Sequence, residues 1–423
     1  MITSVIGKLF LEAYNEKFGT HYDAKTFFIE IFYPLFITCR KKMLKYGNTV
    51  FGNPKLKNKT KEELLHIFLE KINNGITDSS VSVDFPSLDP EIYASGQICY
   101  SLINIEKDDV YLSLIGQGLR IGVEDDLGNW LSVLFFKKNI LLDIFEGWKY
   151  YRKLLNEIEE LKEGQIDLWN ARWLCHKYDL LDYDVDNPLY DLSIGKSRDC
   201  IDMISWTKVL IRIAQNIYDN TMMAYIYQVD TRGNTCAIIG FRQFNLNLIL
   251  KPQQLYQKYF GIYNSRNAEL LWGGGIGFKT ACTQGVIGIK AMEPKGLKEY
   301  INNNKPPKAP KNEEEQININ VYKIWILAML NNEELWEKSL ELAEMLKDAS
   351  FDKDKSISTK RKNLVEQLLN ATKKMQFIAM ATEVIPFVNE KENFIEMVRE
   401  INRMSDENVP YFLTLLRFQY KTI

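Results

Sequence analysis

Three carboxylates in the first third of the chain have a spacing that could hold a divalent metal ion: Asp109, Glu124 and Asp126. They flank two β-rich runs, and carboxylates at the end of a strand are ligands that Mg²⁺ accepts. A metal ion held in this way activates water and stabilises the oxygen that leaves a phosphate ester. These residues are therefore the candidate catalytic set, with Mg²⁺ as the cofactor that they would need.

The spacing of this trio resembles the Asp…Glu-x-Lys arrangement of Mg²⁺-dependent nucleases. That arrangement has a lysine two residues after the glutamate, whereas this chain has Asp126 there. Acidic residues are also frequent in turns, because Asp and Asn suit turn conformations. A restriction-type nuclease that uses these carboxylates is therefore the alternative function, and without that activity no cofactor is required.

Histidine and cysteine offer little catalytic chemistry in this chain. Histidine occurs only at positions 21, 66 and 176, and there is no Gly-x-Ser-x-Gly nucleophile elbow. Cys175 and His176 are adjacent, so their side chains leave the backbone in different directions and are not expected to form a dyad. No two of the six cysteines lie within four residues of each other, which argues against a zinc ribbon and indicates free thiols in a reducing cytosol.

A run of eight basic residues without an acidic one is the strongest signal for binding. It consists of Arg40, Lys41, Lys42, Lys45, Lys55, Lys57, Lys59 and Lys61. Tyr46 and Phe51 lie inside the run, in a loop rich in glycine and asparagine. Cations pair with phosphates and exposed rings stack on bases, so this composition favours a surface that binds single-stranded nucleic acid. A solvated basic surface is the other interpretation.

Two glycine-rich stretches add further lysines. The first, 272–280, contains Lys279, and the second, 285–290, ends in Lys290. Backbone amides freed by glycine can cradle phosphate, and both lysines are therefore candidate contacts to nucleic acid. Phe278 interrupts what would be a nucleotide-binding loop, however, and tight turns between packed segments are the favoured interpretation.

A second basic segment, 353–374, contains Lys360, Arg361 and Lys362. These three residues precede an apolar stripe, so we expect them at or just before the start of a helix. Positive charge there opposes the helix dipole by about 0.3–1 kcal/mol per charge. Basic residues that are mildly unfavourable for folding at this position favour a role in contacting phosphate.

The predicted elements place these residues in an α+β fold. Apolar residues at helical spacing dominate the first 80 residues and the chain after residue 312. Helices are predicted at 61–73, 141–162 and 205–220. Two β-hairpins are predicted between the helical ends, with strands at 110–123, 130–136, 222–229 and 235–241.

A chain of 423 residues exceeds one ordinary domain, and three parts are predicted. They are a helical N-terminal region with the basic loop (1–80), a central α+β domain (81–302) and a C-terminal helical bundle (312–423). A linker with three prolines precedes the bundle. All apolar runs are far shorter than the roughly 20 residues of a membrane span, so a cytoplasmic protein without a membrane partner is expected.

The leading hypothesis is a protein that binds DNA or RNA, as a subunit of a prokaryotic nucleic-acid-processing or antiviral-defence assembly. Basic loops would contact the phosphates, and Tyr46 or Phe51 would stack on bases. The nuclease remains the alternative, so whether the chain is an enzyme stays open. A second alternative is a structural subunit whose charged patches dock on protein partners.

Overall fold

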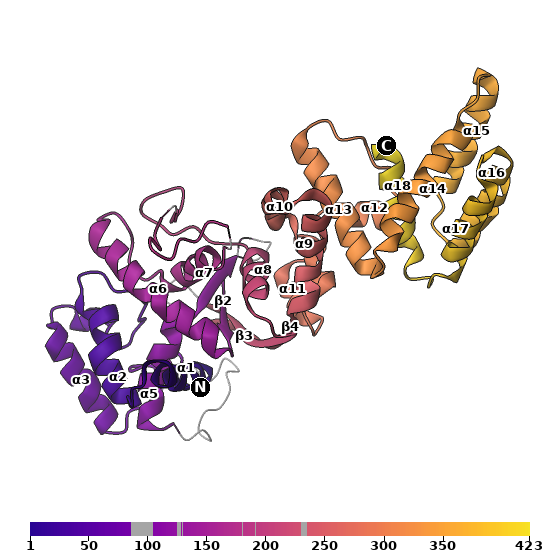
Figure 1. The fold of residues 1–423 in the computed structure, drawn as a ribbon. Helices are drawn as coiled ribbons and strands as arrows, with labels where there is room; N and C mark the ends of the chain where they lie inside the picture. Colours follow the sequence, from indigo (N-terminus) through magenta and orange to yellow (C-terminus); the bar gives the residue numbers. More distant parts are fainter. Residues whose placement is uncertain (86–104, 125–127, 129, 180, 191, 230–234) are drawn as a thin grey trace. The chain divides into compact units, whose positions relative to one another are not determined.

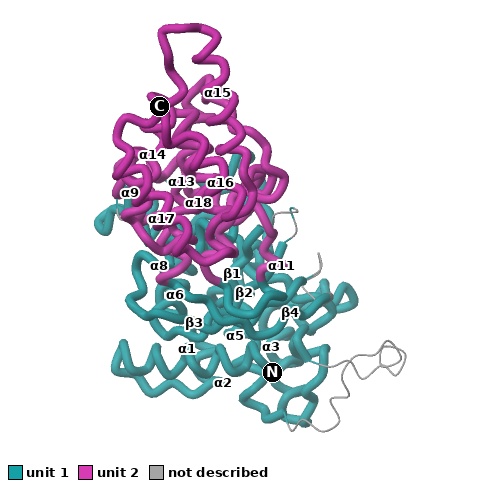
Figure 2. Tube along the Cα trace, turned by 90° about the vertical axis from the view of Figure 1, so that its right-hand side faces the viewer, with its two compact units in different colours: residues 1–246, 282–287 teal, residues 247–281, 288–423 magenta. Residues whose placement is uncertain are grey.

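The structure is a computed structural model of the 423-residue chain, and it describes every residue except 86–104, 125–127, 129, 180, 191 and 230–234. Helices form both ends of the chain and a small antiparallel sheet forms in the central region, which confirms the predicted α+β class (Figure 1). Two compact units are distinguished in Figure 2: residues 1–246 with 282–287, and residues 247–281 with 288–423. The proline-containing linker lies inside the second unit, and the division into three parts stays a prediction.

The N-terminal part of the first unit is helical. Its elements are α1 (Ile2–Phe18), α2 (Ala24–Phe27), the π-helical turns η1 (Phe28–Phe32) and η2 (Pro34–Thr38), the 3₁₀ turn η3 (Pro54–Leu56), α3 (Lys61–Asn73) and α5 (Lys107–Gly118). Helix α3 has the bounds predicted from the sequence. Its start is fixed by a capping box in which the Glu63 amide donates to the Thr60 hydroxyl and the Thr60 amide donates to the Glu63 carboxylate.

Helices α1 and α5 pack with their backbones in close contact. An ideal Cβ on Gly7 would lie 2.0 Å from the carbonyl oxygen of Leu112, and one on Gly116 would lie 2.0 Å from that of Thr3. Only glycine allows this approach. The hydroxyls of Thr3 and Ser113 form a buried hydrogen bond of 2.9 Å across the same interface.

The sheet has the strand order β1-β2-β3-β4 and is antiparallel throughout. Its strands are β1 (Ile121–Glu124), β2 (Trp130–Phe135), β3 (Thr221–Val229) and β4 (Thr235–Asn245). Both predicted hairpins are therefore present, as β1–β2 and β3–β4. Strand β4 lies at one edge of the sheet, where Ile287 pairs with Phe244 near the end of the strand.

The first hairpin is shorter than predicted, because residues 110–118 form most of helix α5. All nine of these residues are buried, so the sequence shows an apolar run without the polar face that would have indicated a helix. At the start of the helix the Glu106 amide donates to the Asp109 carboxylate over 3.1 Å. Asp109 therefore belongs to a helix cap and does not flank the hairpin.

Three helices of the first unit follow β2 in the chain: α6 (Lys138–Glu157), α7 (Ile166–Lys177) and α8 (Trp206–Asn216). Helices α6 and α8 correspond to the segments predicted at 141–162 and 205–220. Helix α7 packs against β1. Gly122 permits this contact, because a Cβ there would lie 3.0 Å from Leu168 and 3.2 Å from the backbone of Asp167.

The chain after β4 is helical. Its elements are α9 (Leu246–Phe260), α10 (Ile262–Ala268), η5 (Glu269–Leu271), α11 (Phe278–Thr283), η6 (Ile289–Met292), α12 (Leu297–Ile301), α13 (Glu313–Leu330), α14 (Glu334–Ser350), α15 (Lys355–Leu369), α16 (Lys374–Val384), η7 (Ile385–Phe387), α17 (Lys391–Arg403) and α18 (Val409–Thr422). Helices α13 to α18 are the predicted bundle, and α18 contacts α12, α13, α14 and α15. In the part of the chain that the structure describes, no helix has both the length and the apolar character needed to cross a membrane.

Candidate functional site

The first half of the basic run is held by contacts within the protein. The Lys41 ammonium donates to the carbonyl oxygens of Ile158 (2.8 Å) and Glu159 (2.6 Å), just after the end of α6. The Lys42 ammonium donates to the carbonyl oxygen of Phe51 over 2.5 Å. Desolvation lowers the pKa of Lys42. Both lysines therefore fix the loop, and only part of their charge faces solvent.

Arg40 and Lys45 complete this half of the run. Arg40 is exposed and pairs with Glu159 over 3.6 Å. The Lys45 ammonium lies 4.7 Å from the centre of the Trp130 ring, a cation–π geometry. Because Trp130 is the first residue of β2, this contact joins the basic run to one end of a sheet strand.

Tyr46 and Phe51 are buried, so the expectation that their rings are exposed for stacking on bases was wrong. Their exposed fractions are 3% and 2%. Phe51 packs against Phe68 with ring centres 4.8 Å apart, and Tyr46 packs edge-on against Phe51 at 5.6 Å. Burial raises the pKa of the Tyr46 hydroxyl. These rings anchor the basic loop on α3. The composition of the loop alone does not distinguish rings that are buried in this way from rings that are exposed for stacking on bases.

The second half of the run is more open to solvent. Lys55 and Lys57 are exposed, and neither forms an ion pair with a described residue. Lys59 is also exposed, but it pairs with Glu63 over 2.8 Å. Lys55 and Lys57 are therefore the exposed lysines of this run with free charge for a phosphate, whereas Lys61 at the start of α3 is half-buried.

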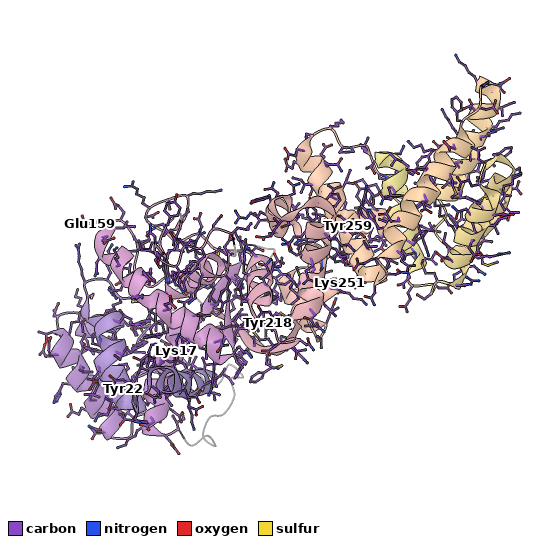
Figure 3. The ribbon with its side chains drawn as sticks, viewed as in Figure 1. Lys17, Tyr22, Glu159, Tyr218, Lys251 and Tyr259 are labelled. Carbon is purple, nitrogen blue, oxygen red and sulfur yellow. The ribbon has the colours of Figure 1, made fainter. Side chains whose placement is uncertain are left out.

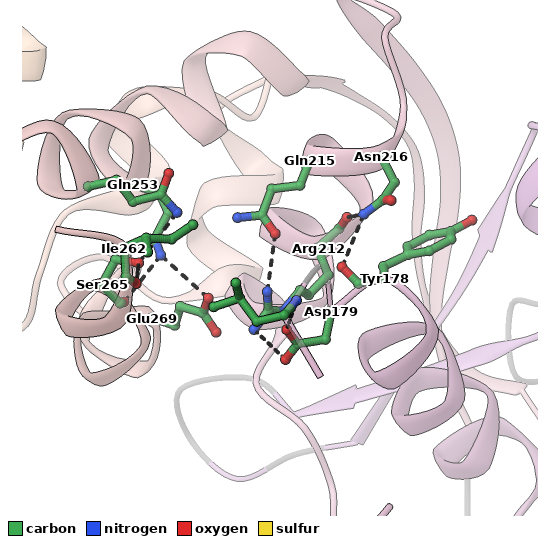
Figure 4. Close-up of polar contacts among 11 residues, drawn as sticks. Tyr178, Asp179, Arg212, Gln215, Asn216, Gln253, Ile262, Ser265 and Glu269 are labelled. Carbon is green, nitrogen blue, oxygen red and sulfur yellow. Dashed lines mark hydrogen bonds and ion pairs between the residues drawn. The ribbon is translucent and has the colours of Figure 1, made fainter. Parts of the chain in front are cut away.

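The glycine-rich stretch 272–280 is built as a packed turn. The Trp272 indole donates to the side chain of Gln253 over 2.8 Å, and the Gly275 amide donates to the carbonyl of Glu293 over 2.7 Å. Gln253 itself donates to the Ser265 carbonyl and to Glu269, as Figure 4 shows. These contacts agree with the interpretation that the glycine-rich stretch forms tight turns between packed segments.

The two lysines of the glycine-rich stretches, Lys279 and Lys290, are both exposed. Lys279 lies in α11, a helix of six residues, and Lys290 lies in the 3₁₀ turn η6. Their ammonium groups form no ion pair with a described residue. Both remain candidate phosphate contacts.

The second basic segment lies on α15, but not at its start. Asp354 caps the helix by accepting from the amides of Ser356 and Ile357, so Lys360, Arg361 and Lys362 stand in its second and third turns. The predicted position was wrong because this cap begins the helix at Lys355. The expected conflict with the helix dipole is therefore small.

The three basic residues of α15 differ in availability. Arg361 donates to the Phe351 carbonyl over 3.1 Å, pairs with Asp352 over 2.8 Å and lies 4.8 Å from the centre of the Phe387 ring. Lys360 and Lys362 are exposed and have no ion-pair partner among the described residues. Arg361 is thus a structural residue of the bundle, whereas the two lysines are open to a ligand.

The structure does not show the three candidate catalytic carboxylates in one common site. Asp109 caps α5, Glu124 ends β1, and Asp126 lies outside the described residues. Among the residues that are described, no group of three or more His, Cys, Asp or Glu side chains could hold a metal ion. Asp179, which follows α7, also has a partner within the fold. It pairs with Arg212 over 3.1 Å, and Arg212 donates to Gln215 (Figure 4).

A patch of exposed and half-buried apolar side chains on the sheet was missed by the sequence reasoning. We call it the β2–β4 patch, and it consists of Phe136, Met223, Tyr225, Ile238 and Phe241. Phe241 is 49% exposed, Ile238 57% and Met223 42%. Strand pairing places Tyr225 directly opposite Phe241, and the Phe136 amide donates to the Met223 carbonyl, so these side chains share one face.

The rings of the β2–β4 patch form a continuous row across three strands. Ring centres lie 5.7 Å apart between Phe136 and Phe241, and 5.1 Å apart between Phe241 and Tyr225. Tyr225 continues to the buried Tyr227 at 5.7 Å. Gly240 has φ +90°, which accommodates a β-bulge and brings Ile238 onto the same face as Phe241. The row thus contains the exposed ring of Phe241 on the edge strand and the half-buried rings of Phe136 and Tyr225.

The same face of the sheet continues into a buried polar cluster under α7. Its centre is Arg120, whose side chain is only 2% exposed, and its other members include Asp167, Tyr227 and Asp84. Burial by itself lowers the pKa of the Arg120 guanidinium, but these three neighbours together raise it. Burial raises the pKa of the Asp167 carboxyl, and the attraction of Arg120 offsets part of that rise. Arg120 therefore stays charged within the protein core.

Several polar atoms of this cluster have no hydrogen-bond partner within the described residues. They are Arg120 Nε and Nη1, Asp167 Oδ2, Ser132 Oγ and Asn170 Oδ1. Asn170 meanwhile donates to the carbonyl oxygens of Gly118 (2.8 Å) and Arg120 (2.7 Å). Unpaired buried polar groups are costly, so the cluster depends on mutual electrostatic attraction.

No protein-family model, curated protein or solved structure matches this chain. The candidate sites are therefore defined by the chain's own residues. They are the β2–β4 patch, the exposed lysines of the basic run and of α15, and Lys279 and Lys290.

Proposed function

We propose that this chain binds single-stranded nucleic acid, with bases stacked on the β2–β4 patch and phosphates paired with exposed lysines. The observation that carries the proposal is the row of partly exposed rings Phe136, Phe241 and Tyr225 on an antiparallel sheet. Base–aromatic stacking contributes about 1–3 kcal/mol per base and tolerates any sequence, because every base has a π-face.

A cation at the far end of β2 supports this arrangement. Lys45 lies on Trp130 at the other end of β2 from Phe136. Six residues of strand separate these ends, a length of about 20 Å. A strand of nucleic acid that runs from the rings along β2 would therefore meet the positive charge of Lys45.

Replacing Phe241 with alanine is expected to weaken binding of labelled oligo(dT) and oligo(U) about tenfold, since one stacking ring is lost. Fluorescence anisotropy across a salt series measures the affinity. Phe241 is half exposed, so the fold should keep its melting temperature. Tyr263→Ala, which removes a 76%-exposed ring from α10, is the matched control and should bind like the parent protein. Equal affinity for Phe241→Ala and the parent would refute the stacking role.

The phosphate contacts are tested at lysines that the fold does not use. Reversing Lys41 or Lys42 would break their hydrogen bonds to backbone carbonyls, so a loss of binding would not identify a phosphate contact. Lys55→Glu with Lys57→Glu changes only exposed charges. If both residues contact phosphates, the slope of log affinity against log salt should become shallower by about 0.7 per contact. The two labelled oligonucleotides show whether DNA or RNA is preferred.

A further inference from the structure

A cavity of about 590 Å³ opens between α1, the π-helical turns η1 and η2, and α6, all within the first unit. Ligand sites in proteins are commonly about 300–1,000 Å³ in volume. The floor of the cavity is apolar and includes Ile31, Leu35, Leu142 and Phe145. Phe18, at the end of α1, adds a ring that is 50% exposed. The cavity is thus large and apolar enough for a small hydrocarbon body.

The wall of the cavity is a helix widened into π turns. Pro34 has no amide hydrogen, so it cannot donate to the carbonyl of Glu30 and the regular α-helical ladder is interrupted there. The turns on both sides of this position, η1 and η2, are π-helical. Arg152 of α6 holds the wall in place by donating to the carbonyl oxygens of Leu35 and Lys41, each over 2.8 Å. Single π turns within helices are often found at functional sites.

Charged groups line the mouth of the cavity, and cations predominate. Lys17 and Lys149 are exposed, and neither forms an ion pair within the described part of the chain. The carboxylates that line the cavity are Glu30 and Glu146, and Glu146 is already bound by Lys177 over 2.5 Å. Arg152 adds a buried positive charge at the base. The electrostatic complement of this mouth is a single anionic group.

From this geometry we propose that the cavity binds a small amphiphile with one anionic head group, such as a medium-chain carboxylate. The hydrocarbon body lies on Leu142, Phe145 and Ile31, and the head group lies between the ammonium groups of Lys17 and Lys149. This site is independent of the β2–β4 patch, because none of its lining residues belongs to the sheet. A volume of about 590 Å³ suits a small molecule.

Calorimetric titration with decanoate, decan-1-ol and decylamine, each below its micelle-forming concentration, tests this proposal. The three probes share a ten-carbon chain and differ in head-group charge. Decanoate should bind with a dissociation constant of about 10–100 μM, and decylamine at least about tenfold more weakly. Equal binding of all three probes, or no decanoate binding below about 1 mM, would overturn the proposal.

Two variants separate the roles of charge and volume. Lys149→Glu should remove the preference for decanoate over decylamine, and Ile31→Trp should fill the cavity and weaken all three probes. Lys153→Glu is the matched control: it lies one turn further along α6, is exposed, and does not line the cavity. Circular dichroism establishes that each variant is folded. Unchanged decanoate affinity in both Lys149→Glu and Ile31→Trp would contradict the assignment.

Discussion

Replacing Asp167 with alanine is expected to lower the free energy of unfolding by about 3–5 kcal/mol, because it leaves the buried charge of Arg120 with less compensation. Arg120 is 2% exposed and Asp167 is 1% exposed, so water cannot take the place of the lost carboxylate. Asp84 and Tyr227 remain near the guanidinium and limit the loss. Denaturant unfolding of the variant and the parent measures the difference.

A double variant separates the ion pair from other roles of Asp167. Arg120→Met with Asp167→Leu removes both charges and keeps most of the volume. Replacement of a whole buried pair by apolar residues is often nearly neutral. The single variants Arg120→Met and Asp167→Leu complete the cycle, and the double variant should be more stable than the sum of their two effects implies. Asp184→Asn, in an exposed loop, should change stability by less than about 0.5 kcal/mol. Strict additivity of the single effects would show that the pair does not act as a unit.

Replacing Lys323 with methionine is expected to stabilise the protein at pH 7 by about 2 kcal/mol. Lys323 of α13 is 5% exposed, and its ammonium donates to Gln419 and Thr422 but pairs with no carboxylate among the described residues. Desolvation lowers the pKa of Lys323 to about 8. The shift from the ordinary value corresponds to about 3 kcal/mol at neutral pH, and the loss of a donor to Gln419 offsets about 1 kcal/mol of the gain.

The stability gain from Lys323→Met should depend on pH in a defined direction. Below pH 8 the amine is protonated in both the folded and the unfolded chain, and the full cost of burying its charge is present. Between about pH 8 and 10.5 the unfolded chain binds more protons than the folded chain, so the parent protein gains stability as the pH rises. The difference between variant and parent should therefore shrink over this window.

Chemical unfolding at pH 7 and at pH 10 measures that difference. Lys353→Met, at an exposed lysine just before α15, is the control and should show no such convergence. A gain from Lys323→Met that is the same at both pH values would contradict a buried, destabilising ammonium group.

Local signals in the sequence were sufficient for much of the fold. The strands predicted at 222–229 and 235–241 are β3 and β4, because β-branched and aromatic residues flank the sequence Asp-Thr-Arg-Gly-Asn, whose composition favours a turn. Helix α3 has the predicted bounds, since Thr60 and Glu63 form a capping box next to an amphipathic run. Where a segment is buried on every side, as in residues 110–118, periodicity is absent and the helix was mistaken for a strand.

The candidate site was less accessible to sequence reasoning. The rings of the basic run are buried, and the exposed rings lie on the sheet instead. Met223 and Tyr225 are two residues apart in β3, and this spacing in the sequence could have indicated that they share one face of the sheet. On β4 the bulge at Gly240 places Ile238 and Phe241 on one face although they are three residues apart, so a period of two does not reveal the patch. The pairing of β3 with β4 is needed to see that the bulge brings these two side chains onto the same face.

Photocrosslinking with an oligonucleotide that carries 5-iodouracil tests the central claim most directly, because this base couples preferentially to aromatic side chains stacked on it. Mass spectrometry of the digested complex locates the attachment. The proposed function predicts crosslinks to Phe136, Tyr225 or Phe241, and their loss when unlabelled single-stranded competitor is added. A complex that forms under the same conditions but crosslinks only to residues outside the β2–β4 patch would contradict the account.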